Sequence, residues 1–234
     1  MENMFWQKKA PNTTAVESCA HALFKTLADN LRKNGRIRCE DIITAAASIV
    51  AEACIAAAAD YNLRKHEFVP GSRVFSTRVN ELFSGDVPDE GIDSPPSGSI
   101  VGVLRDRLVV SGFDRSDFPQ LKKIFQDFAA GVGKPSTWGS VPLSVPSENA
   151  PSILPLRFAY ETRSTVDSLF KPLTNPQDRL HASVLALAET LIAVRQVIDR
   201  RTALLLALEI INGMAKTAPM TDDAMKAAKK QSGG

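Results

Sequence analysis

The chain has 234 residues, of which 44% are hydrophobic and 23% charged, a composition typical of a folded globular protein and not of a disordered chain. Basic residues exceed acidic ones by two, so the net charge of +2 gives no field that would favour a nucleic acid as partner. The three cysteines are an odd number without paired spacing, which argues against a disulfide framework and favours reduced thiols in the cytoplasm.

Apolar residues recurring every three or four positions predict two long helices near the N-terminus, over about 14–34 and 40–62. The second carries two adjacent apolar stripes, so we expect it to lie at the centre of the protein. Its run 42–59 is the most apolar of the chain. Because alanine is only weakly apolar and Glu52 interrupts the run, we expect a buried helix and no membrane span.

Shorter helices are predicted next. Ser72 is expected to cap a helix that ends at Gly85, and a further helix spans 99–110. The Asp117 to Pro119 segment reads as the start of another. The acidic, proline-containing segment 86–98 is a loop, and it is the place where the chain would divide if it formed two units.

The Pro/Ser-rich stretch 134–155 shows no helical period, and connections of this length are usually functional or disordered. Three helices are predicted after it, over 156–170, 176–198 and 202–216.

The pattern as a whole predicts an all-α fold, a multi-helix bundle of about seven or eight helices with one long loop. We expect a single helical domain over residues 12–216. A tail, 217–234, would carry one further short helix.

The segment 64–78 gathers several basic side chains around a predicted helix start. Free amides at a helix N-terminus together with arginine side chains bind small anions, so Ser72, Arg73 and Arg78 form a candidate anion site. The alternative is a solvated loop whose arginines pair with the acidic segment downstream.

Two carboxylate–imidazole pairs have the spacing of metal ligands. Glu17 and His21 are four residues apart, and Asp178 and His181 are three apart, so each pair shares a helix face. Two such pairs on facing helices could hold a metal ion, as in di-metal bundles. Surface ion pairing explains the same four residues without a metal.

No catalytic constellation stands out, so we expect a non-enzymatic, cytoplasmic helical protein without a cofactor, acting as a protein-interaction or regulatory module. The helices over 176–198 and 202–216 have enough apolar surface to supply a homodimer interface as well as a core. Two alternatives remain: a small-anion or metabolite-binding module using 64–78, and a metal-dependent enzyme of helical-bundle type.

Overall fold

The computed structural model describes residues 13–59, 69, 71–72, 74, 76–85, 96–130 and 141–221. These residues form eight α-helices and no β-strand, so the predicted all-α fold class is confirmed. The helices are α1 (Thr13–Asn30), α2 (Cys39–Ala58), α3 (Thr77–Ser84), α4 (Ile100–Val110), α5 (Leu121–Ala129), α6 (Pro155–Leu169), α7 (Pro176–Val194) and α8 (Arg200–Ala215). Two three-residue 3-10 helices, η2 (Arg115–Asp117) and η4 (Ser147–Asn149), lie between them.

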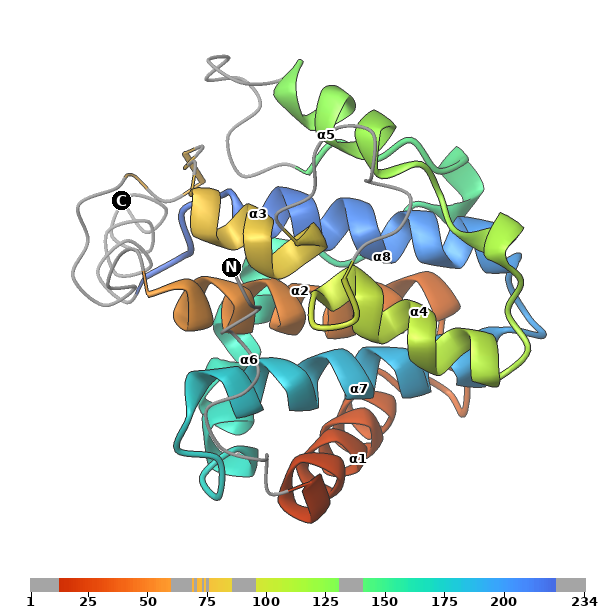
Figure 1. The fold of residues 1–234 in the computed structure, drawn as a ribbon. Coiled ribbons are helices and arrows are strands. Elements are labelled where there is room, and N and C mark those ends of the chain that lie inside the picture. The colour runs from red at the N-terminus through yellow and green to blue at the C-terminus, as the bar shows by residue number, and fades with distance from the viewer. Residues whose placement is uncertain are drawn as a thin grey trace, which may run out of the picture.

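Helix α2 is the centre of the fold, as its double apolar stripe predicts. It packs against α7 on one side and α8 on the other, with α6 and α3 also in contact, and Figure 1 shows it between these two long helices. Fifteen of its 20 residues are buried. Although α2 is long and apolar enough to cross a membrane, 78% of its most apolar window is buried inside the protein, which is the position of a core helix.

Helices α4, α7 and α8 each begin after a polar residue whose side chain caps the helix N-terminus. Ser99 accepts a hydrogen bond from the amide of Gly102, Asn175 from that of Gln177, and Asp199 from that of Thr202. Each side chain satisfies an amide that has no partner within the helix. These caps are local signals, which is why the starts at Ser99 and Asn175 are predictable.

The prediction that Ser72 caps the third helix is wrong. Ser76 is the cap, and its Oγ accepts from the amide of Val79 at 3.0 Å. The main chain at Ser72 pairs instead with the segment that follows α8. The Ser72 carbonyl accepts a hydrogen bond from the Ala218 amide, and the Val74 amide donates to the Lys216 carbonyl, both at 2.8 Å. This pairing holds Ser72 and Val74 beside the segment that follows α8, and α3 begins only at Thr77.

Helices α1 and α2 both end four residues before the predicted limits. After α1, Lys33 and Arg36 exchange two main-chain hydrogen bonds across a tight turn whose central residues, Asn34 and Gly35, have φ of 50° and 76°. Asparagine and glycine tolerate this left-handed conformation best, so the turn is favoured over another helical turn.

One hydrophobic core includes residues on both sides of the loop 86–98. Val79 and Phe83 of α3 belong to it, as do Ile100 and Leu104 of α4. Helix α4 also lies very close to the end of that loop, because a Cβ on Gly102 would be 2.0 Å from the Pro96 carbonyl oxygen. The predicted short C-terminal helix lies outside the described residues.

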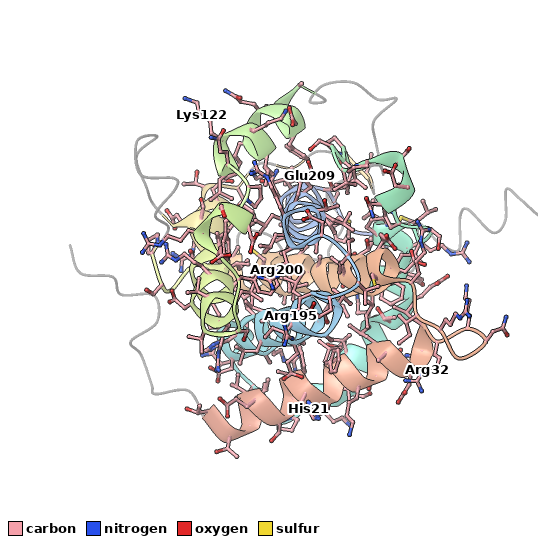
Figure 2. All side chains as sticks on the ribbon, turned by 90° about the vertical axis from the view of Figure 1, so that its right-hand side faces the viewer. His21, Arg32, Lys122, Arg195, Arg200 and Glu209 are labelled. Atoms are coloured by element: carbon pink, nitrogen blue, oxygen red, sulfur yellow. The ribbon has the colours of Figure 1, made fainter. Side chains whose placement is uncertain are left out.

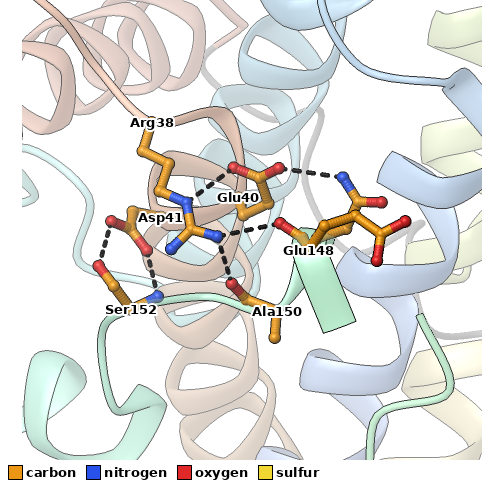
Figure 3. Close-up of polar contacts among 7 residues, drawn as sticks. Arg38, Glu40, Asp41, Glu148, Ala150 and Ser152 are labelled. Carbon is orange, nitrogen blue, oxygen red and sulfur yellow. Dashed lines mark hydrogen bonds and ion pairs between the residues drawn. The ribbon is translucent and has the colours of Figure 1, made fainter. Parts of the chain in front are cut away.

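Residues 141–154, which we call the strap, are the described part of the Pro/Ser-rich stretch. The strap contains η4 and is fixed to the helices by carboxylates (Figure 3). Asp41 accepts the amide and the hydroxyl of Ser152, each at 2.6 Å. Glu209 accepts both groups of Ser144.

The guanidinium of Arg38 adds a third attachment at the start of α2. It donates to the carbonyls of Glu148 and Ala150 at 3.2 and 2.7 Å, and its Nε pairs with Glu40 at 3.2 Å. Farther along the strap, Val141 packs so closely on α8 that a Cβ on Gly213 would lie 2.6 Å from its Cγ1. The strap is therefore an ordered cover over α2 and α8.

Candidate functional site

The predicted anion site finds no support among the described residues. Arg73 lies outside them. Arg78 donates from Nη1 to Glu81 Oε2 at 3.1 Å on its own helix, and Ser72 is held by main-chain pairing away from the helix N-terminus. The amides that were to bind the anion belong to a helix capped by Ser76. The physical basis of the prediction, a free N-terminus at Ser72, is absent.

The four predicted metal ligands all lie in α1 and α7, which pack against each other, but the two in α1 are engaged in other contacts. Glu17 pairs with Arg107 of α4 at 3.4 Å, and His21 Nδ1 lies 3.0 Å from Glu189 Oε2. Among the described residues, no group of three or more His, Cys, Asp or Glu side chains is placed to hold a metal ion.

His181 lies among two carboxylates and one arginine. Burial lowers the pKa of its imidazole, the nearby Arg107 lowers it further, and Asp178 and Glu17 oppose this. Asp178 therefore lies near His181, as their spacing predicts, and Glu17 of α1 reaches the same neighbourhood through the packing of α1 on α7. Arg107 supplies the positive charge there, which disfavours a cation.

The cysteines are poor candidates for nucleophilic chemistry, because a thiol reacts as its thiolate. Burial raises the pKa of Cys19 and of Cys39, where the charge of Glu40 adds to the effect. Burial also raises the pKa of Cys54 to about 12. All three thiols are held in the protonated form.

The most unusual ionisable group is Lys216, which directly follows α8. Its side chain is buried at 4% exposure beneath α5, where Nζ lies 4.3 Å from the centre of the Phe125 ring and 5.6 Å from that of Phe128. Nζ donates to Asn212 Oδ1 at 2.6 Å. Desolvation lowers the pKa of the amine to about 8. A buried amine with such a pKa is typical of functional lysines as well as of structural ones.

Sequence reasoning missed Lys216 because a lysine in the last turn of a helix normally lies in solvent near the helix dipole. The one local signal is Asn212, four residues earlier on the same face. The rings that bury it come from α5, about 90 residues away in sequence, so their approach is a tertiary event.

A second feature lies at the end of the bundle where α4 finishes and α7 connects to α8 (Figure 1). Three valines are exposed there, Val109 at 44%, Val110 at 89% and Val197 at 75%. Arg200 joins the two segments, donating from Nη1 to the Gly112 carbonyl at 2.5 Å. We call Val109, Val110, Val197 and Arg200 the apolar end.

Arg200 is held in place at the apolar end by further contacts. Its guanidinium lies 5.4 Å from the ring centre of Phe113 and 3.9 Å from a carboxylate oxygen of Asp117. Figure 2 views this end of the bundle and shows Arg200 and Arg195 near its middle. Phe113 is itself buried, so Arg200 and the exposed valines form the surface here, and arginine is enriched in protein-binding surfaces.

Comparison with protein-family models, with curated proteins and with solved structures finds no match to this chain.

Proposed function

We propose that this protein is a non-enzymatic interaction module that associates with a second copy of itself through the apolar end. The observation that carries the proposal is the exposure of Val109, Val110 and Val197 at the end of the bundle where Arg200 links the start of α8 to the turn after α4. Of the five large hydrophobic side chains exposed among the described residues, three gather there. Exposed apolar residues that cluster, unlike single ones, mark interaction surfaces.

The burial of the C-terminal helices supports this end, and not their faces, as the place of association. Twelve of the 16 residues of α8 and 11 of the 19 residues of α7 are already buried within the chain itself. The predicted homodimer interface on these two faces is therefore not supported, because their apolar side chains are used in the core.

The low net charge of the chain also favours a second copy of the protein as the partner at the apolar end. The net charge of +2 on 234 residues creates little repulsion between two copies, and low net charge promotes self-association. Three valines and an arginine are less than the roughly 800 Å² per partner of a stable complex. We therefore expect a weak, reversible dimer with two-fold symmetry, in which the same patch serves both partners.

A binding role is also consistent with how the candidate chemical groups are used. Glu17 is paired with Arg107, His21 contacts Glu189, and the thiols are held protonated.

Sedimentation equilibrium over a wide range of protein concentration tests the proposal. We expect the average mass to rise with concentration for the wild type and to stay at the monomer value for the variant Val110→Asp/Val197→Asp. The matched control is Val69→Asp/Leu154→Asp, which introduces the same two charges at exposed hydrophobic residues outside the apolar end, 58% and 67% exposed. A wild type that remains monomeric at every concentration, or an equal loss in the control, would refute the proposal.

A further inference from the structure

The amide of Asn212 beside Lys216 is only half satisfied. Asn212 is 1% exposed, and its Oδ1 accepts from Lys216 Nζ, while its Nδ2 has no hydrogen-bond partner. A lysine ammonium only donates, so the oxygen of the amide must face it, and this fixes the orientation of Asn212. A buried N–H group without an acceptor is costly and rare in native proteins.

The ammonium itself also has unfilled donors, and it lacks a counter-ion among the described residues. It carries three N–H donors, of which one reaches Asn212. No described carboxylate forms an ion pair with Lys216, and Cys54, the one ionisable group that acts on its pKa, supplies no charge near pH 7 because its own pKa is raised to about 12. The rings of Phe125 and Phe128 offer their faces to the charge but no lone pair.

We propose that Lys216 and Asn212 bind a small monovalent anion, a halide or a formate-sized carboxylate, beneath α5. Such an ion would accept hydrogen bonds from Nζ and from Asn212 Nδ2 and would neutralise the buried charge. Both unfilled positions are donors, so the ligand must be an acceptor, and a metal ion is excluded by the ammonium. Water satisfies donors but leaves the charge uncompensated, and this distinguishes it from an anion.

The surroundings restrict the size of the ion and suggest how it enters. Asn212 and Lys216 are buried between α8 and the rings of Phe125 and Phe128, and these rings offer no hydrogen-bond donor to a dianion such as phosphate. The cover is α5, a nine-residue helix that packs on α8 and whose Phe125 meets Phe83 of α3 edge to face at 5.8 Å. Displacement of this one short helix would open the site.

This site differs from the anion site that the basic segment suggested, although the chain brings the two near each other. The Val74 amide donates to the carbonyl of Lys216 itself, at 2.8 Å. The new site depends on a buried lysine and a buried amide, and it needs neither Arg73 nor Arg78.

Thermal unfolding at pH 7 and constant ionic strength tests the inference, with sodium gluconate as the background because gluconate is too large to enter. Replacing gluconate by chloride, bromide or formate should raise Tm in a saturable way, by about 3 to 6 °C at tenfold excess over Kd. Lys216→Met and Asn212→Leu should abolish the rise. Lys122→Met, at an exposed lysine on α5, is the control that should retain it.

Two further measurements keep the inference falsifiable if a variant does not fold. Asn212→Asp supplies a carboxylate from within the protein, so this variant should unfold at the same temperature with and without the small anions. In wild-type crystals grown with bromide, anomalous scattering should place the ion within hydrogen-bond distance of Nζ and Asn212 Nδ2. No rise in Tm for the wild type, an equal rise in Lys216→Met, or a water at that position would overturn the inference.

Discussion

Replacing Lys216 by methionine should stabilise the protein near neutral pH, and the gain should fade as the pH rises. Methionine is close to lysine in length and fills the same space without a charge. The change also leaves the buried Asn212 Oδ1 without its donor, which costs about 1–3 kcal/mol and offsets part of the gain. The pH dependence therefore isolates the contribution of the buried charge.

The magnitude follows from the pKa of Lys216, which desolvation lowers from 10.5 to about 8. Below pH 8 both the folded and the unfolded chain are protonated, and the full cost of burying the charge is present. Between pH 8 and 10.5 the unfolded chain holds a proton that the folded protein has released, so stability rises with pH. The difference in pKa corresponds to about 3 kcal/mol at pH 7, of which about 2 kcal/mol should be recovered by pH 9.5.

Urea unfolding of the two proteins at a series of pH values from 7 to 9.5, in gluconate, measures this difference. Cys54 acts in the opposite direction above pH 9, since its raised pKa makes the folded state keep a proton that the unfolded chain loses. Its contribution is common to both proteins and cancels on subtraction. A stability difference between Lys216→Met and the wild type that does not change with pH would refute the account of a buried charge.

Three further substitutions test the packing and the strap, each by urea unfolding. Gly102→Ala should cost about 1–3 kcal/mol or more, because its Cβ would meet the Pro96 carbonyl, and a neutral result would show that this loop yields easily. Asp41→Ala leaves the amide and hydroxyl of Ser152 without their acceptor and should cost about 2 kcal/mol, with faster hydrogen exchange over residues 141–154. Ser147→Ala, in the exposed part of the same strap, is its control, and equal losses would contradict a specific role for Asp41. Asn175→Ala removes the cap of α7 and should cost about 1 kcal/mol, whereas no loss would mean that the free amides are satisfied by solvent.

The helices themselves are largely predictable from local sequence. The central position of α2 follows from its two apolar stripes, since a helix that is apolar over so wide a face must be covered on several sides. The starts at Ser99 and Asn175 follow from side chains that cap amides two or three residues ahead. Each of these signals acts within one or two helical turns, so no knowledge of the fold is needed.

The candidate sites could not be predicted in the same way, because they depend on which segments of the chain come into contact. The spacing of Asp178 and His181 correctly places them on one face, but the sequence could not show that Arg107 of α4 would pair with Glu17, 90 residues away. Ser72 has the composition of a helix cap, yet its main chain pairs with the segment after α8 and the cap moves to Ser76. The exposure of Val110 and Val197 likewise follows from where the ends of α4 and α7 lie.

What the sequence by itself determined is the set of helices and the residues that face the core, because hydrophobic periodicity and capping operate over distances of a few residues. The tertiary structure alone decided which ionisable groups lose their water. Lys216 is an ordinary lysine at the end of α8 until the phenylalanines of α5 pack over it. Desolvation depends on every atom near a charge, whatever its position along the chain, and so it is a property of the folded protein.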